Sequence, residues 1–244
     1  MVRTILLLFI LIAGTFNAYP KDTSVTEDTR PVALIYSGQG VCEENCTKAA
    51  AHVVQKERFK IDLVNSENFD LTLLEKAKLW VQPGGDAVVV AKALKPKKLT
   101  ALKTFIKNGG SYLGFCAGAF LADHKVDDAL TINGLGLIPG VTKDYFPEGK
   151  KTGIFPVLWE NQMRYLYFED GGYFDLVEDN TVKVIAKYMD GKTAAIFFNY
   201  EKGKVALSFP HPEATLEWKN SNNLIDPDGE DLDLAEQLVR YLLN

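Results

Sequence analysis

Net positive charge, histidine and cysteine are all scarce in this sequence, and each scarcity excludes a class of function. The net charge of −5 over 244 residues gives no general attraction for nucleic acid, so we expect no nucleic-acid partner. Only three histidines and three cysteines are present, and the pair Cys42 and Cys46 lacks the further ligands that complete a zinc motif. The sequence therefore predicts no metal and no cofactor.

Long apolar runs are lacking as well. Residues 5–13 are apolar but too short to span a bilayer comfortably, and they follow a short positive segment at Arg3. Small residues up to Ala18 then fit a secretory cleavage site. We predict a signal peptide over residues 1–18, a polar leader over 19–30, and export to the periplasm or the exterior with no stable membrane insertion after cleavage. An uncleaved N-terminal anchor is the alternative.

What the sequence does contain is a regular alternation of apolar, strand-length runs and helical segments. In the first half these apolar runs lie at residues 31–36, 59–64, 79–81 and 112–115. This order predicts an α/β fold with a doubly wound, mostly parallel sheet. In the second half, short glycine turns separate the strand-like runs, which favours a C-terminal antiparallel extension of that sheet. The composition suits a single domain over residues 31–244.

The strongest local pattern centres on Cys116. A short apolar run leads into Gly114-Phe115-Cys116-Ala117-Gly118, the cysteine counterpart of the nucleophile elbow G-x-S-x-G. A strand that reverses sharply into a helix strains its corner residue and needs small neighbours, because strand and helix nearly touch there. The corner side chain projects above the sheet, so we predict that Cys116 is a nucleophile. A buried structural cysteine is the alternative.

Two other glycine turns, at residues 37–40 and 83–86, follow predicted parallel strands. Ligands of doubly wound sheets bind beyond the carboxyl ends of the strands, where these turns and the predicted nucleophile converge. We therefore expect a small-molecule substrate in this crevice, in contact with Gly38, Gly84 and Asp86. Plain strand-to-helix turns would also explain these glycines.

A second glycine-containing segment is rich in aromatic residues. Phe168, Gly171, Gly172 and Tyr173 lie close together in the sequence. They predict an aromatic wall for the substrate pocket, whereas aromatic residues in strands more often serve the core.

A thiol nucleophile needs a base, and usually an acceptor that orients the base. His124 lies eight residues beyond the predicted nucleophile, about 12 Å along a helix and too far. His52 lies within the first predicted helix, on its flank. His211 precedes a proline, which disfavours a helical conformation. Residues two apart on an extended chain face the same way, so we predict His211 as the base and Glu213 as its orienting carboxylate. A proline-rich turn with a surface histidine is the alternative.

Four segments of the sequence together resemble one known family, at residues 110–119, 135–140, 167–174 and 210–213. They resemble class I glutamine-amidotransferase-like domains, and most closely the N-terminal domain of fungal-type biotin–protein ligases. The resemblance covers the chain from about the first predicted strand to the C-terminus. It implies a flavodoxin-like, amidotransferase-like sheet with Cys116 as nucleophile, His211 as base and Glu213 as orienter.

The same resemblance implies an oxyanion hole formed by the backbone N–H groups of Gly85 and Ala117. We expect no ligase half in this chain, because the predicted domain uses the sequence up to its end. Biotin transfer is therefore not implied.

The sequence predicts a secreted cysteine hydrolase or acyl transferase that acts on a small amide or ester through a thioacyl intermediate. A glutamine amidotransferase would need a synthetase partner for its ammonia, which a secreted stand-alone chain would lack. A non-catalytic ligand-binding module that keeps the crevice is the alternative. The related glyoxalase or chaperone-type superfamily is a third alternative. The sequence disfavours it, because proteins of that superfamily have an acidic residue after the first strand, where this chain has Ser37-Gly38-Gln39-Gly40.

Cys42 and Cys46 stand four residues apart. On a regular helix their Cα atoms would be about 6 Å apart, near the limit for a disulfide. The sequence leaves open whether they pair in an oxidising compartment. We predict that both lie beyond the reach of the nucleophile and that replacing both with serine leaves any activity intact.

Overall fold

The computed structural model describes residues 28–127, 129, 131–177 and 181–244. The predicted signal peptide, and the predicted leader up to residue 27, lie outside these residues. Among the residues described, no helix is both long enough and apolar enough to cross a membrane.

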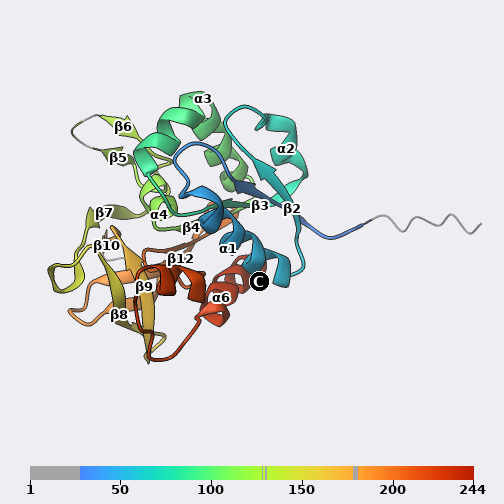
Figure 1. Ribbon diagram of the computed structural model, residues 1–244. Helices are drawn as coiled ribbons and strands as arrows, with labels where there is room; N and C mark the ends of the chain where they lie inside the picture. Colours follow the sequence, from blue (N-terminus) through green and yellow to red (C-terminus); the bar gives the residue numbers. More distant parts are fainter. Residues whose placement is uncertain (1–27, 128, 130, 178–180) are drawn as a thin grey trace, which may run out of the picture.

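One 11-stranded sheet forms the centre of the molecule, and its first half is parallel (Figure 1). The strands of this half, in spatial order, are β2 Lys60–Val64, β1 Val32–Tyr36, β3 Ala77–Gln82, β4 Ser111–Phe115 and β13 Gly203–Ser208. In β1 and β4, four of the five residues are buried. Continuous burial of this kind is expected for parallel strands that are covered on both faces.

The other half of the sheet is antiparallel. It continues from β13 through β12 Thr193–Tyr200, β11 Val182–Tyr188, β8 Thr152–Trp159 and β9 Gln162–Glu169. Two more strands, β10 Gly172–Leu176 and β7 Gly140–Asp144, pair with each other, and β10 also pairs with β12. The predicted α/β fold, with a parallel sheet and an antiparallel extension, is confirmed.

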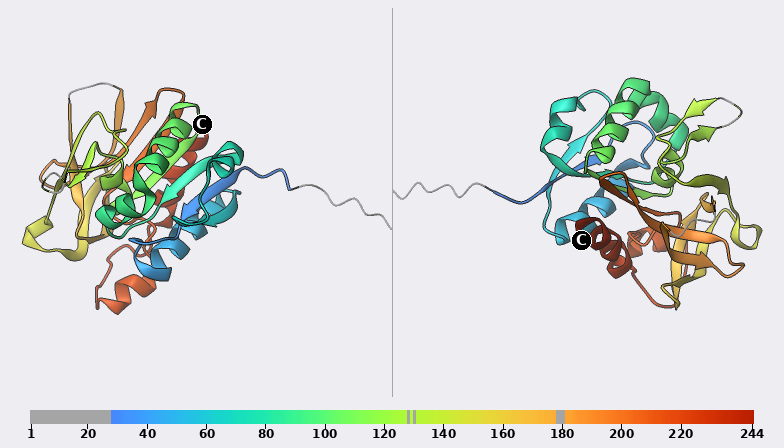
Figure 2. Two further views of the ribbon diagram at one scale, coloured as in Figure 1. Left: turned by 90° about the horizontal axis from the view of Figure 1, so that it is seen from above. Right: turned by 180° about the vertical axis from the view of Figure 1, so that it is seen from behind.

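Helices cover both faces of the parallel half, and Figures 1 and 2 show α3 and α6 on opposite sides of it. The helices are α1 Glu43–Lys56, α2 Leu71–Lys76, α3 Ala87–Lys107, α4 Ala117–Leu121, α5 Leu216–Ser221 and α6 Leu232–Leu243. Side chains of β1 alternate between the two layers: Ala33 and Ile35 pack with α1 and α6, whereas Leu34 and Tyr36 pack with α3. A short 3-10 turn, Pro147–Gly149, and a hairpin of β5 Lys125–Asp127 and β6 Ile132–Asn133 complete the fold.

α3 is interrupted at Lys95, which has φ 61° and ψ 158°. Proline at position 96 causes the break, because its ring disfavours a helical conformation at the residue before it. α3 thus consists of two helical parts that meet at Lys95 and Pro96.

Candidate active site

Cys116 lies at a sharp corner between β4 and α4. Its φ of 47° falls in the left-handed region, which is unfavourable for a residue with a side chain. Close packing surrounds the corner: a Cβ at Gly118 would lie 2.3 Å from the carbonyl oxygen of Gln82, and one at Gly114 would lie 2.7 Å from the backbone of Gly118. The structure therefore has the strained strand-to-helix corner that the glycine spacing predicts.

The end of β13 brings His211 to the same corner. β13 pairs in parallel with β4, with Ser208 opposite Phe115, and the Cys116 N–H donates to the Ser208 carbonyl at 2.8 Å. Farther along, the His211 N–H donates to the Tyr167 carbonyl at 2.8 Å. The histidine segment is thus held between the strand that leads to the cysteine and β9 of the antiparallel half.

Cys116, His211 and Glu213 form one buried cluster. His211 Nδ1 lies 2.8 Å from Glu213 Oε1, and the two side chains are 4% and 1% exposed. Cys116 lies close enough to the imidazole to contribute to the raised pKa of His211. Since Glu213 engages Nδ1, Nε2 is the nitrogen that remains for the sulfur. The structure therefore brings together the three residues that the sequence singles out as nucleophile, base and orienter.

The electrostatics of this cluster favour a protonated imidazole. Burial of the ring opposes protonation, but the Glu213 charge, the neighbouring Cys116 and the hydrogen bond with Glu213 outweigh it and raise the pKa of His211 well above its ordinary value. The raised pKa makes His211 a stronger acceptor for the Cys116 proton and favours the thiolate–imidazolium pair once that proton has moved.

The thiol is free but covered. Cys116 forms no disulfide and is 5% exposed, and its Sγ donates a hydrogen bond to the Glu169 carbonyl at 3.6 Å. The rings of Tyr167 and Trp218 pack edge-on against the His211 ring, with centroids 5.8 Å and 5.5 Å away. Any substrate must therefore pass or displace part of this cover.

A hollow of about 200 Å³ opens beside the cluster. Its lining residues are Cys42, Asn45, Tyr167, Glu169, Trp218, Ser221 and Asn222. The Tyr167 hydroxyl donates to Glu169 Oε2 at 2.9 Å and accepts from Asn222 Nδ2 at 3.2 Å. The sequence prediction missed this lining. The signal that could have found part of it is the spacing of Tyr167 and Glu169, which lie two apart on β9 and share a face.

The backbone N–H groups of Gly85 and Ala117 remain candidates for an oxyanion hole. Gly85 lies in the loop after β3, and Ala117 is the first residue of α4. Neither N–H donates a hydrogen bond within the described part of the chain. Gly85 has φ 137°, and a Cβ there would lie 2.0 Å from the Gly40 carbonyl oxygen, so the loop admits only glycine. The oxyanion role of the two groups stays a prediction.

Gly84 is the loop residue that contacts the cluster, among the three predicted to bind substrate. A Cβ at Gly84 would lie 2.8 Å from His211 Cε1 and 3.3 Å from Cys46 Sγ. The Asp86 carboxylate instead caps α3, where it accepts from two backbone N–H groups. Gly38 packs against the tyrosine ring at the end of β1. The structure thus gives Asp86 and Gly38 local structural roles.

The segment expected to form an aromatic wall contributes to the core instead: Phe168, Gly171 and Gly172 are buried, and the half-buried Tyr173 packs against the core. Phe168 is fully buried and packs edge-on against Phe155. β10 already begins at Gly172, whose carbonyl accepts from the Tyr188 hydroxyl at 2.8 Å. The physical reason is strand parity, because Phe168 faces the opposite side of β9 from the two residues that line the hollow.

Cys42 and Cys46 form a disulfide, with Cα atoms 5.6 Å apart. Cys42 lines the hollow, and Cys46 is buried in a cluster with Tyr167 and Trp218. The disulfide therefore belongs to the wall of the candidate site, closer to the proposed chemistry than the sequence prediction implied.

The other two histidines lie away from this cluster. His52 is exposed on α1, and His124 is exposed beyond α4, where it lines a different cavity.

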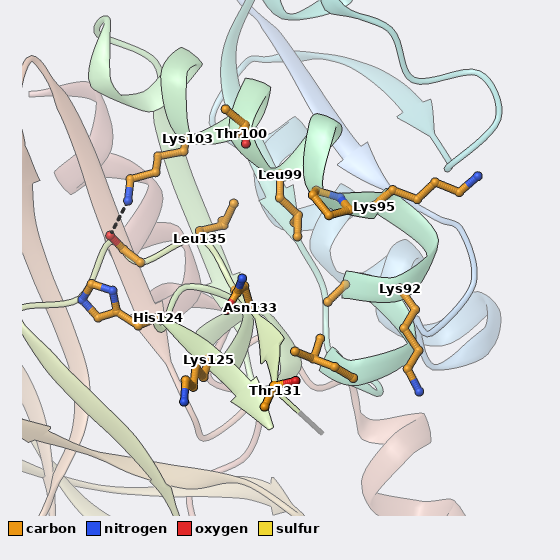
Figure 3. Close-up of a pocket in the computed structure, with 15 residues that line it drawn as sticks. Lys92, Lys95, Leu99, Thr100, Lys103, His124, Lys125, Thr131, Asn133 and Leu135 are labelled. Atoms are coloured by element: carbon orange, nitrogen blue, oxygen red, sulfur yellow. Dashed lines mark hydrogen bonds between the residues drawn. The ribbon is translucent and has the colours of Figure 1, made fainter. Parts of the chain in front are cut away.

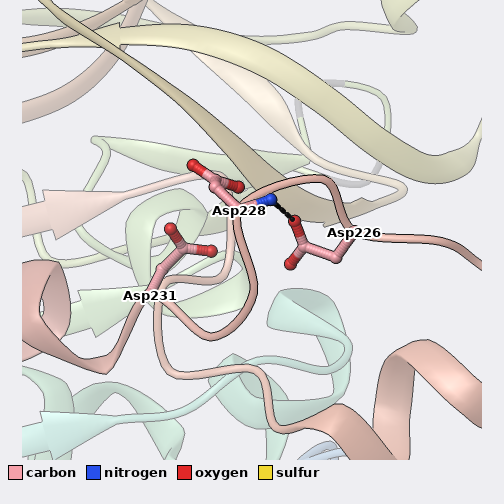
Figure 4. A group of neighbouring side chains, drawn as sticks. All are labelled: Asp226, Asp228 and Asp231. Carbon is pink, nitrogen blue, oxygen red and sulfur yellow. Dashed lines mark hydrogen bonds between the residues drawn. The ribbon is translucent and has the colours of Figure 1, made fainter.

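Asp226, Asp228 and Asp231 gather in one loop before α6 (Figure 4). Two basic side chains already pair with them. The Lys219 ammonium, on a side chain that is 1% exposed, contacts Asp226 and lies 3.5 Å from Asp231. The Arg164 guanidinium lies 3.3 Å from Asp228 and 2.8 Å from Asp231. The group is therefore an ion-pair network that ties this loop to α5 and β9.

Comparison with known sequences places this geometry in context. The family model described as "Biotin-protein ligase, N terminal" matches residues 32–156. The biotin–protein ligase of Schizosaccharomyces pombe is 26% identical over 240 residues, which cover 86% of this chain and 37% of that ligase. The chain thus spans little more than a third of that relative. An uncharacterised protein of Chlamydia muridarum is 30% identical over 210 residues, which cover 74% of this chain and 79% of that protein.

Solved structures share the fold. A crystal structure of a glutamine amidotransferase matches with a TM-score of 0.64 at 16% identity, over 87% of this chain and 99% of that one. A glutamine amidotransferase from Thermotoga maritima matches with a TM-score of 0.55 at 14% identity, over 88% and 96%. At such identities the likeness establishes an amidotransferase-like fold.

We predict that Gly118→Ala destabilises the protein by about 3 kcal/mol, because the new Cβ would overlap the Gln82 carbonyl and overpacking forces backbone shifts. Gly191→Ala is the control: its φ is 87° but no atom lies within 4 Å, so it should lose only about 1–2 kcal/mol of left-handed strain. Urea unfolding measures both. Equal losses would contradict a steric role for Gly118.

The raised pKa of His211 predicts a pH dependence of stability. Because the folded state holds this proton more tightly than the unfolded state, the resulting stabilisation is full below the unfolded value of about 6.5 and is lost as pH rises through the folded value. The free energy of unfolding should therefore fall from neutral to alkaline pH more steeply in the wild type than in His211→Gln. Urea titrations of both proteins test this, and parallel profiles would exclude a protonated His211.

Proposed function

The chain belongs to the family of biotin–protein ligase N-terminal domains, and from this premise we propose that it is an exported cysteine hydrolase or acyl transferase for a small amide or ester. The observation that carries the proposal is the buried contact of Cys116 with His211, which is itself held by Glu213. A thiol, an imidazole and a carboxylate in this order of contact are what nucleophilic catalysis by cysteine requires.

The proposed reaction begins with transfer of the Cys116 proton to Nε2 of His211. The thiolate then attacks the carbonyl carbon of the substrate, so that a C–S bond forms and the carbonyl electron pair moves to oxygen. The N–H groups of Gly85 and Ala117 are the proposed donors to this oxyanion. Glu213 accepts from Nδ1–H and so keeps Nε2 directed at the sulfur.

Collapse of the oxyanion breaks the C–N or C–O bond. The leaving group takes the proton from Nε2 of His211 and departs as an amine or alcohol, and a thioester remains on Cys116. For hydrolysis, water gives a proton to Nε2 while its oxygen attacks the thioester; the C–S bond breaks, the thiol recovers its proton and a carboxylic acid leaves. For transfer, an acceptor amine or alcohol takes the place of water.

The hollow beside the cluster is the proposed substrate site. Its volume of about 200 Å³ suits a small substrate rather than a folded protein. The Glu169 carboxylate and the side-chain amides of Asn45 and Asn222 offer it hydrogen bonds. No residue of the lining supplies a positive charge, so the site favours neutral or cationic substrates over anionic ones.

The second candidate function is a ligand-binding module without catalysis. The observation that favours it is the cover over the thiol, since Cys116 is 5% exposed and its Sγ is occupied by the Glu169 carbonyl. In this case the hollow would bind a small molecule while the cysteine stays inert. The reactivity of the thiol separates the two functions.

We predict that Cys116 is the residue that a small alkylating agent such as iodoacetamide modifies near neutral pH, and that His211→Ala slows this modification at least about tenfold because the proton acceptor is lost. Glu213→Gln should slow it less, since the imidazole remains. Mass spectrometry of the labelled protein gives the rates. Unchanged labelling in His211→Ala would favour the binding module.

Turnover provides the direct test of the enzyme. We expect hydrolysis of at least one member of a panel of small amides, esters and glutamyl compounds, and a loss of about a thousandfold or more in Cys116→Ala. Cys42→Ser/Cys46→Ser, which removes the disulfide but none of the reacting groups, should keep activity in the properly folded fraction. A product that forms equally fast with Cys116→Ala would assign the reaction to another residue.

We predict that residues 1–18 are removed on export. The Cys42–Cys46 disulfide supports this proposal, because such bonds persist in oxidising compartments. Intact-mass measurement of the protein from its native host should give a chain that begins after Ala18. A mass that includes Met1 or Arg3 would contradict cleavage.

A further inference from the structure

We propose that the cavity between α3 and the β5–β6 hairpin is a second ligand site, which binds a small organic anion by its apolar body and its negatively charged head. The cavity has a volume of about 650 Å³ and shares no lining residue with the hollow beside Cys116. This volume is in the usual range for small-molecule sites, about 300–1,000 Å³.

The floor of the cavity is apolar. Leu99 and Leu135, which are 7% and 2% exposed, come from α3 and from the chain after β6. Figure 3 shows both side chains between α3 and the hairpin. Ala91, Pro96 and Ile132 complete this surface. Such a floor binds the hydrocarbon part of a ligand but contributes little to the binding of an inorganic ion.

The rim of the cavity is basic. Lys92, Lys95, Lys103, Lys125 and His124 line it, and its lining contains neither aspartate nor glutamate. This contrasts with the chain as a whole, whose net charge is −5. The local excess of positive charge therefore selects anions at this place on an otherwise acidic protein.

Two of these lysines are available to a ligand. Lys92 and Lys95 are exposed, and neither makes an ion pair in the described part of the chain. In Figure 3 the two side chains extend from α3 to the side away from Leu135 and His124, so they must turn back to reach a ligand, whereas Lys103 donates to the Gly136 carbonyl at 3.1 Å. Long, flexible lysine side chains at the mouth can fold over an anionic head while its body rests on the leucines.

The break in α3 lies at the cavity, because Lys95 and Pro96 both belong to the lining. Lys95 holds φ 61° directly before Pro96, a conformation that costs about 1–3 kcal/mol. Lys92 and Lys95 of the first part and Leu99 and Lys103 of the second all line the cavity, at the three- and four-residue spacing of one helix face. A solvated helix face would explain the lysines alone, but it would explain neither the cavity nor the absence of acidic residues from its lining.

Calorimetric titration of the purified protein tests the site with four probes: phenyl phosphate, hexanoate, inorganic phosphate and hexylamine. We expect phenyl phosphate or hexanoate to bind at least about tenfold more tightly than inorganic phosphate and hexylamine. The anion that binds more tightly is then used with the variants. Binding of inorganic phosphate as tight as that of phenyl phosphate would reduce the site to surface lysines, and equal binding of hexylamine would remove the role of charge.

Three variants locate the binding. Lys92→Glu/Lys95→Glu should weaken the binding of the preferred anion at least about tenfold. The control is Lys187→Glu, which changes an exposed lysine on β11 and should leave the affinity unchanged. Asn133→Trp, at an exposed position of the lining, should block the cavity while keeping every lysine. Circular dichroism verifies folding of each variant. Anion binding that survives Asn133→Trp at full strength would overturn the proposal, whatever the lysine variants show.

Discussion

The parallel pairing of β4 with β13 is the constraint on which the candidate site depends. The two strands are far apart in the sequence, yet the hydrogen bond from the Cys116 N–H to the Ser208 carbonyl extends their pairing past the end of β4. The chain that continues from Ser208 must therefore pass the cysteine, and His211 arrives beside it already extended. The elbow supplies the strained corner, but the neighbouring strand supplies the imidazole. A change in strand order would separate the two even if both local patterns were kept.

Burial strengthens the interaction between His211 and Glu213, and it also costs stability. Glu213 is fully buried, and within the described residues its Oε2 has no hydrogen-bond partner, so only Oε1 is compensated by His211. An ion pair buried in this way contributes little to stability, and apolar residues of similar volume often serve a core better. Gln82, at the carboxyl end of β3, likewise buries an unpartnered amide close to Gly118. Packing alone does not account for the buried Glu213 carboxylate, whereas the proposed proton transfer at His211 would use it.

Local sequence patterns singled out the three residues that cluster in the structure. They could not predict residues whose place at the site depends on how distant strands and helices come together. The glycine spacing predicts Cys116, and the alternation of side chains along an extended chain predicts that His211 and Glu213 share a side. Neither prediction requires knowledge of the neighbouring strands. The hollow could not be predicted in this way, because its lining comes from β9, α5 and the start of α1. Phe168 shows the limit clearly. A difference of one residue along β9 sends its ring into the core and leaves Tyr167 and Glu169 at the site.

The hydrogen bond from the Cys116 thiol to the Glu169 carbonyl depends on the protonation state of the sulfur, and this connects the cover to the proposed chemistry. The thiol donates to the Glu169 carbonyl at 3.6 Å only while the proton stays on sulfur. When the proton moves to Nε2 of His211, a negatively charged sulfur faces the partial negative charge of that same carbonyl, and the contact becomes repulsive. Activation of the thiol therefore weakens its hold on the end of β9, which carries both Tyr167 and Glu169 of the hollow. In the proposed mechanism the nucleophile becomes charged and loses its cover in one step, so deep burial of the resting thiol is compatible with catalysis.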